Sequence, residues 1–292
     1  MSQSLSNVEQ ILFDEQVKAA YQSYGYMLRD KVRARTDVEG TQVSFRKVGS
    51  VTAEQYAFQT QVNWQDPGFS KQNVTLQAYR AASLIDDMEQ FLVNFDVREE
   101  EAMLVGMALG RRSDQLIIDA LAASGTANTI ANASAGMTYD KVREIVYFFD
   151  ENAVPHEDRC IAISAKAQQQ LMASVQFTNS RYTDLDAVKD GSLHKKFAMG
   201  MNWVVIPAMT EGGLPKTGDV RSCFAWNKMA MGMGVGKNFS TVIERVPTVD
   251  SWQVLGKMFA NAVAVDNVGI VQCDIDESVV ETSAMTITTL TP

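Results

Sequence analysis

The sequence predicts an α+β fold organised around one long β-hairpin and one long helix. Residues 41–65 alternate apolar and polar side chains in two runs separated by the linker at 49–54, which is the period of β-strands. Residues 97–123 continue one helical pattern that opens with three glutamates, as suits a helix N-terminus. From residue 138 onward shorter helical and strand patterns alternate, so both kinds of element belong to the same fold.

Composition and charge exclude several classes of protein. The chain has 292 residues, of which 46% are hydrophobic, enough for one large domain or two ordinary ones with a sizeable core. The net charge of −9 argues against tight, sequence-independent binding of nucleic acid, which requires basic patches. No apolar run approaches the roughly 18 residues of a membrane span, and residues 1–16 lack the pattern of a secretory signal.

The N-terminal third is predicted to be helical and then extended. Residues 1–35 begin polar and continue as a helix, whose apolar stripe runs from Val17 to Leu28 and whose C-terminus carries the basic residues of 29–35. Residues 54–65 are predicted to form a strand with an aromatic face. A two-stranded ribbon is marginal in water, so we expect this face to lie against another subunit. The alternating residues of that face are Tyr56, Phe58, Thr60, Val62 and Trp64.

The middle of the chain follows with a further strand and the long helix. Residues 74–79 alternate again, and 84–95 carry an apolar stripe that begins at Leu84. The helix at 97–123 can reach about 40 Å, and Gly106 and Gly110 allow close packing against it.

The remaining sequence predicts a mixed region. Thr138 is the expected N-cap of a helix that runs to about residue 154. Further strands and a helix follow, with polar loops at 177–197 and 210–219 between them. The predicted segments are strand 159–165, helix 165–175, strand 201–209, strands 221–235 and 239–247, and a C-terminal region, 252–275, that ends in a strand.

Three alternating glycines, Gly232, Gly234 and Gly236, precede Lys237 and superficially suggest a phosphate-binding loop. A P-loop would need glycine at 231 and a hydroxyl side chain at 238, where Met231 and Asn238 stand. Apolar residues alternate with the glycines at the period of a strand. We therefore predict a strand whose glycine face lets another backbone or a large side chain come close.

Candidate chemical groups are few and scattered, so no catalytic, cofactor-binding or metal-binding residue is expected. His156 and His194 lie in polar turns, and the three cysteines fit no metal or disulfide spacing, which favours buried free thiols. Residues 183–191 depart from a calcium loop at Val188 and Lys189. The acidic cluster of Asp274, Asp276 and Glu277 stands at the end of a strand, where charge usually serves solvation. The cysteines are Cys160, Cys223 and Cys273.

The order of these elements resembles the major capsid proteins of tailed bacteriophages, which have the HK97-like fold. The resemblance covers nearly the whole chain and rests on the sequence of elements rather than on a short motif. It implies an N-terminal arm at 1–36, an extended E-loop hairpin at 37–78, and a P-domain at 79–135 that contains the spine helix 97–123. It further implies an A-domain at 136–240, with a return to the P-domain and a C-terminal tail at 241–292.

The resemblance implies a structural role without catalysis, in which copies form the hexamers and pentamers of an icosahedral shell around double-stranded DNA. The E-loop would lie across a neighbouring copy, and loop 210–219 would lie near the capsomer axis. The partners implied are a scaffolding protein, a portal and a cement protein, with packaged DNA bound without sequence specificity and no membrane. The protein would reside in the virion after assembly in the cytoplasm of the bacterial host. The residues expected at contacts between copies are Phe45, Arg46, Lys47, Tyr56, Phe58, Val62, Trp64, Arg111, Arg112, Gly212, Gly213, Leu214 and Pro215.

Three alternatives stay open at the level of sequence. An encapsulin shares the fold but encloses cargo enzymes. A cytosolic α/β enzyme would use residues 138–236 and would need His, Asp or Lys residues converging at strand ends, which the sequence does not indicate. A tail or neck protein would form rings or tubes instead of closed shells.

Overall fold

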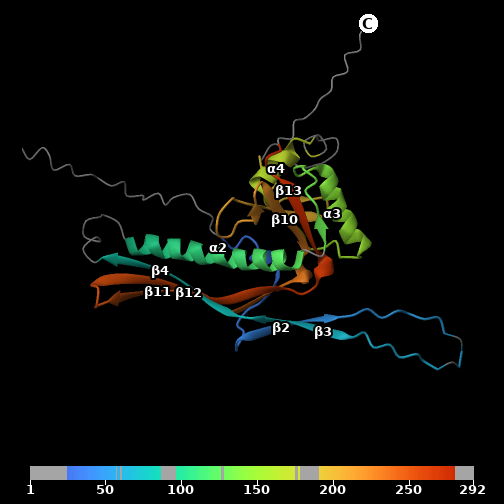
Figure 1. Ribbon diagram of the computed structural model, residues 1–292. Helices are drawn as coiled ribbons and strands as arrows, with labels where there is room; N and C mark the ends of the chain where they lie inside the picture. The colour runs from blue at the N-terminus through green and yellow to red at the C-terminus, as the bar shows by residue number, and fades with distance from the viewer. Residues whose placement is uncertain are drawn as a thin grey trace, which may run out of the picture.

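The computed structural model describes residues 25–56, 58–59, 61–86, 97–125, 128–174, 177 and 191–279. The mixed α+β fold predicted from the sequence is confirmed. An elongated layer consists of helix α2 (Val97–Gly125) lying along one sheet, and a second sheet with helices α3 and α4 stands at one end of that layer (Figure 1). A hairpin arm projects from the opposite side of the first sheet.

The first sheet has the order β1-β11-β12-β4, and its two long central strands are antiparallel. Helix α2 packs on one face, where Val105 of the helix and Ile85 and Val254 of the sheet form a buried cluster. Gly256 provides the room, because a β-carbon there would lie 2.5 Å from Val105. The strands of this sheet are β1 (Arg33–Arg35), β4 (Gln77–Asp86), β11 (Met231–Val246) and β12 (Ser251–Ala264).

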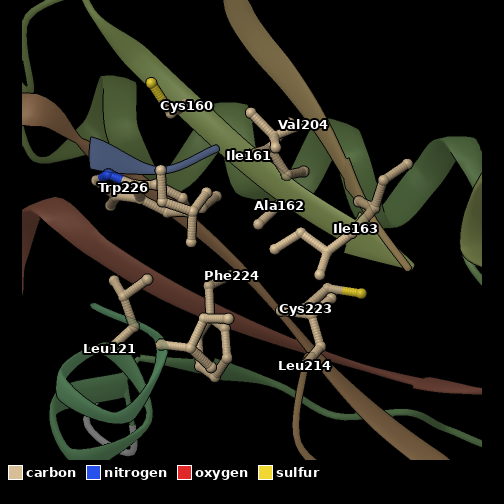
Figure 2. Close-up of a cluster of buried hydrophobic side chains, with 14 of the residues drawn as sticks. Leu121, Cys160, Ile161, Ala162, Ile163, Val204, Leu214, Cys223, Phe224 and Trp226 are labelled. Carbon is tan, nitrogen blue, oxygen red and sulfur yellow. The ribbon is translucent and has the colours of Figure 1, made fainter. Parts of the chain in front are cut away.

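The second sheet has the order β5-β13-β10-β6-β8-β7, with β9 paired to β10. Every residue of β6 is buried, and Figure 2 shows its side chains packed with those of β10 and with Leu121 from α2, so α2 contributes to the cores of both sheets. The strands are β5 (Thr129–Ile130), β6 (Arg159–Ser164), β7 (Phe197–Ala198), β8 (Met201–Ile206), β9 (Lys216–Thr217), β10 (Val220–Asn227) and β13 (Ile270–Asp276).

Two helices accompany the second sheet, and both begin after a side-chain N-cap, of which Thr138 was predicted. Helix α3 (Tyr139–Glu151) starts after Thr138, whose side chain accepts a hydrogen bond from the Lys141 amide. Helix α4 (Ala165–Met172) starts after Ser164, which accepts from the Ala167 amide at 3.1 Å. Short 3-10 turns lie at η2 (Arg29–Lys31), η3 (Lys228–Ala230) and η4 (Asn267–Gly269).

The hairpin is formed by β2 (Gln42–Val48) and β3 (Phe69–Thr75), which pair antiparallel. Its base packs on the face of the first sheet that is turned away from α2. Val43 and Phe45 meet the glycine side of β11, as the alternation of glycines predicted. The chain therefore holds the hairpin by its base and leaves residues 49–68 extended beyond it (Figure 1).

Several local predictions are corrected by long-range pairing. Residues 29–35 do not close an α-helix, because they form η2 and then β1, which pairs parallel with β11. The predicted strand at 54–65 is wrong for the described residues of that segment, which contain no strand. Leu84, the first residue of the predicted stripe, lies in β4 and is half exposed.

The point at which the chain passes from the second sheet to the first also differs from the expected domain boundary at 240/241. Strand β11 lies in the first sheet from residue 231, and η3 separates it from β10, so 221–235 is not one strand. Strand β13, from the expected return segment, lies in the second sheet beside β10. The predicted helix before residue 25, the rest of the stripe at 87–95 and the tail after 279 lie outside the described residues.

Candidate assembly surface

The base of the hairpin is fixed to its own chain by close packing and one ion pair. Phe45 is fully buried, with the Arg33 and Arg35 guanidinium groups over its ring at 5.8 and 5.4 Å. Lys47 pairs with Asp266 at 2.7 Å. Phe45 and Lys47, both expected at contacts between copies, thus serve the fold of the subunit itself.

The arm beyond the base, residues 49–68, carries large apolar side chains that its own chain leaves uncovered. Phe58 is 93% exposed and Trp64 is 87% exposed, and Tyr56 and Val62 are also exposed. The rings of Tyr56 and Phe58 contact each other edge to face, with centroids 6.3 Å apart. Such an aromatic surface is typical of a binding site for another protein.

Side chains hold the two sides of the arm together where no strand ladder forms. Gln65 accepts a hydrogen bond from the Thr52 amide at 3.0 Å, and Glu54 accepts one from the Asn63 amide at 3.3 Å. These contacts are exposed to water and are few, so the arm can adapt to a partner without breaking a core.

The remaining residues expected at contacts between copies lie against α2. The Arg112 guanidinium lies 4.7 Å from the ring of Tyr79 and 4.0 Å from the Glu211 carboxylate, which makes it an internal partner. Arg111 is half-buried, and its backbone lies beside Gly212.

Loop 210–215 is held in place by its own chain. The Gly212 amide donates to the Gln115 side chain at 2.8 Å, and the Leu214 carbonyl accepts from buried Arg221 at 2.9 Å. Gly213 and Leu214 are buried, while Pro215 is partly exposed. Among the residues predicted on sequence grounds, Tyr56 and Phe58 contact each other, Val62 and Trp64 are exposed, and loop 210–215 is hydrogen-bonded to its own chain.

The groups considered for metal or acid–base chemistry have structural partners. Asp274 accepts from Ser222 at 2.7 Å, and Glu277 accepts from Arg221 at 2.6 Å. Hydrogen bonds from Ser278 hold the pKa of Asp276 below its ordinary value. Within the described residues, no group of three His, Cys, Asp or Glu side chains is arranged to hold a metal; most of the segment 183–191 lies outside them.

His194 and the three cysteines of the described chain also have structural surroundings and no arrangement for chemistry. His194 accepts from the Val205 amide through Nδ1 at 3.2 Å, and burial, followed by nearby Lys195, lowers its pKa. The three cysteines are free and buried, and burial raises the pKa of Cys160 to about 11 and that of Cys223 to about 12. Thiols in such surroundings are unreactive.

The exposed aromatic side chains of the arm form a surface of the kind that binds another protein. The family described as phage capsid protein matches residues 5–277, and the chain belongs to that family. It is a major capsid shell protein with the HK97-like fold, and its place is the capsid of the virion. An encapsulin is not favoured, and the family is one of structural proteins.

Solved structures agree with this fold over nearly the whole chain. Mycobacterium phage Che8 matches with a TM-score of 0.70 and 16% identity, over 92% of this chain and 98% of that one. The capsid of cyanophage P-SCSP1u gives 0.71 and 17%, over 94% of both chains. The capsid of Helicobacter pylori bacteriophage KHP30 gives 0.73 and 10%, over 94% of this chain and 98% of that one. No curated protein matches the chain by sequence.

Among the helices of the described residues, none is both long enough and apolar enough to cross a bilayer.

Proposed function

We propose that this protein assembles into hexamers and pentamers of an icosahedral shell around double-stranded DNA, and that the arm at 49–68 joins each copy to its neighbour. The observation that carries the proposal is the exposure of Phe58 and Trp64 on an arm whose base is rigidly anchored. Exposed aromatic residues on a fixed support lose little conformational freedom on binding and so provide effective contacts. Contacts between copies are assigned to Arg46 and to the four apolar residues Tyr56, Phe58, Val62 and Trp64.

The parts of the fold have separate roles in this proposal. The first sheet with α2 is the P-domain, and α2 is the spine helix. The second sheet with α3 and α4 is the A-domain, which meets its copies at the centre of each capsomer. Residues 1–36 act as the N-terminal arm. The protein works by mechanical contact and carries out no reaction.

The proposed partners follow from the needs of a closed shell. A scaffolding protein sets the curvature, a portal occupies one vertex, and a cement protein can bind outside. Assembly takes place in the cytoplasm of the bacterial host. The net charge of −9 suits a shell that encloses DNA without gripping particular sequences.

Electron microscopy of the purified protein, with and without its neighbouring gene products, tests the proposal together with light-scattering mass. Closed shells of megadalton mass are expected. A 32.2 kDa monomer under both conditions would overturn the proposal. Rings or tubes in place of closed shells would overturn it in favour of a tail or neck protein.

A further inference from the structure

A cleft lies between residues 25–31 and β8, and it shares no residue with the hairpin or its arm. Its volume of about 630 Å³ falls in the range of pockets that hold small ligands. Residues 25–31 form one wall, and residues 194–195 and 202–204 form the other. Each wall carries one lysine, so a ligand in the cleft would meet a positive charge on both sides.

The wall at 25–31 is fastened to the rest of the subunit, and this fixes the backbone of Lys31. The Asp114 carboxylate accepts hydrogen bonds from two amides of this wall at 3.0 and 3.1 Å. The Lys31 carbonyl accepts from the Trp226 indole at 2.9 Å. The half-buried Lys31 side chain therefore extends from a fixed point, and its ammonium group forms no ion pair within the described chain.

The facing wall holds a second lysine, whose backbone is also fixed. The Lys195 amide donates to the Trp203 carbonyl at 2.8 Å, and Lys195 has a φ of 60°, in the left-handed region. A residue other than glycine keeps this conformation only where its surroundings enforce it, and such positions cluster at ligand sites. The Lys195 side chain is exposed and likewise has no ion-pair partner among the described residues.

His194 adds a neutral donor beside Lys195. Its Nδ1 accepts from the Val205 amide, so the neutral ring carries its proton on Nε2, which is free to donate. Burial, followed by nearby Lys195, lowers the pKa of His194, and the ring therefore adds no charge of its own at pH 7.

The balance of groups in the cleft favours an anion with several oxygen atoms. Among the described residues that line it, Asp30 is the one acid, and it is exposed and pairs with neither lysine. Two ammonium groups and one imidazole N–H thus offer donors from both walls. Lysine binds phosphate in this way, as a positive charge with three donors.

We propose that this cleft binds a phosphate group, which Lys31 and Lys195 hold from opposite walls and to which His194 donates through Nε2. The group can come from free phosphate or from the backbone of a nucleic acid, because both present the same charged oxygens. Bound phosphate would join residues 25–31 to the second sheet and would stabilise the folded subunit by mass action. This site goes beyond the proposed function and does not depend on shell formation.

Isothermal titration calorimetry of the full-length, unassembled subunit at pH 7 tests the site with inorganic phosphate, and sodium chloride is the blank. We expect one phosphate per subunit. Lys31→Gln should lower the affinity by about tenfold, because a charged contact is lost at a half-buried position. Lys195→Gln should lower it by about threefold, since its side chain is exposed. Asp30→Asn should raise it by about threefold, because the acid that repels the ligand is removed.

A hexathymidylate oligonucleotide distinguishes the two sources of phosphate. If it binds more tightly than inorganic phosphate and the two compete, the nucleic-acid backbone is the source. If inorganic phosphate alone binds, free phosphate is the source. Either result supports the site.

The matched control for the double change Lys31→Gln with Lys195→Gln is Lys166→Gln with Lys257→Gln, which removes the same charge from α4 and β12, outside the cleft. Circular dichroism establishes that each variant is folded. Should Lys31→Gln fail to fold, Lys195→Gln and Asp30→Asn still test the site.

Three results would overturn the proposal. The first is an unmodified subunit that binds neither probe. The second is an affinity for phosphate that the cleft variants leave unchanged, or that the control pair lowers equally. The third is a hexaglutamate peptide that binds where phosphate does not, which would favour an acidic protein partner. Because binding is measured on unassembled subunits, each of these results leaves the proposed function standing.

Discussion

The ring of Phe45 lies against the backbone of Gly232, where a β-carbon would approach the ring to 2.8 Å. The two residues are far apart in the sequence and join the base of the hairpin to β11. The glycine segment that superficially suggested a nucleotide site is thus the surface on which the base of the hairpin packs.

Gly232→Ala is expected to lower the free energy of unfolding by about 1–3 kcal/mol, because the added methyl group overlaps the Phe45 ring and the ring must move. Urea denaturation of unassembled subunits measures the change. Phe45→Leu in the same chain should make the combined loss smaller than the sum of the separate losses. Gly106→Ala is the control, since its methyl group would meet Phe239 at 3.4 Å, an ordinary contact. Equal stability of Gly232→Ala and the unmodified protein would contradict the role given to this contact.

Much of the fold could be predicted from the sequence where the signal is local. The N-cap at Thr138, the alternation of glycines in β11 and the long pattern of α2 each depend on neighbouring residues, and each is observed. Residues 29–35 could not be assigned in this way, because β1 exists through pairing with a strand some 200 residues away.

The assembly surface, too, could be predicted where its signal is local and not where it depends on long-range packing. The alternation at 54–65 identified aromatic residues with no role in the core, but alternation does not make a strand without a partner ladder. Phe45 shares the period of those aromatic residues yet is buried, because it packs against Gly232 of a distant strand. The order of the strands in the first sheet is set by long-range pairing, which the period of the sequence does not contain.

Glu277 joins three elements of the second sheet, and its loss should be costly. Its carboxylate accepts from Ser164 at 2.8 Å and Arg221 at 2.6 Å and pairs with Lys216 at 3.1 Å. Burial alone would raise its pKa, but these partners outweigh burial and hold the pKa below its ordinary value. Glu277→Gln leaves Arg221 buried without its anion and should destabilise the subunit by roughly 3 kcal/mol in thermal or urea unfolding.

The control for that change is Lys216→Met, which removes the most exposed partner and should cost about 1 kcal/mol or less. Equal losses of unfolding free energy in the two variants would show that the pair with Arg221 is not the main contribution of Glu277 to stability.

Asp114 makes the stability of the subunit depend on pH, and one substitution at this residue removes that dependence. The carboxylate is buried in α2 and accepts from the Met27 and Leu28 amides at 3.0 and 3.1 Å. Burial raises its pKa to about 6 despite these hydrogen bonds. The native state therefore binds this proton more tightly than the unfolded state. The resulting stabilisation is complete below about pH 4 and is lost as pH rises through 6, by roughly 3 kcal/mol in all.

Asp114→Asn removes the titration. Relative to this variant, the unmodified subunit should lose stability between pH 4 and pH 8, measured as the difference between their urea unfolding free energies at each pH. Glu277 contributes with the opposite sign but is present in both proteins and cancels in the difference. Parallel stability profiles would contradict the raised pKa of Asp114.

Phe58 and Trp64 are expected to matter for assembly but not for folding. Replacing both by Ala removes apolar surface that is uncovered in the subunit, so the free energy of unfolding should change by less than about 0.5 kcal/mol. Shell formation should fall at least tenfold, because exposed aromatic anchors typically contribute 2 kcal/mol or more each to an interface. Light scattering and electron microscopy measure assembly, and unfolding in urea measures stability. Tyr147→Ala is the matched control, since Tyr147 is a large exposed aromatic residue on α3, away from the arm. A doubly substituted protein that assembles as well as this control would remove the arm from the interface, whereas a loss of folding would mean that the arm supports the subunit itself.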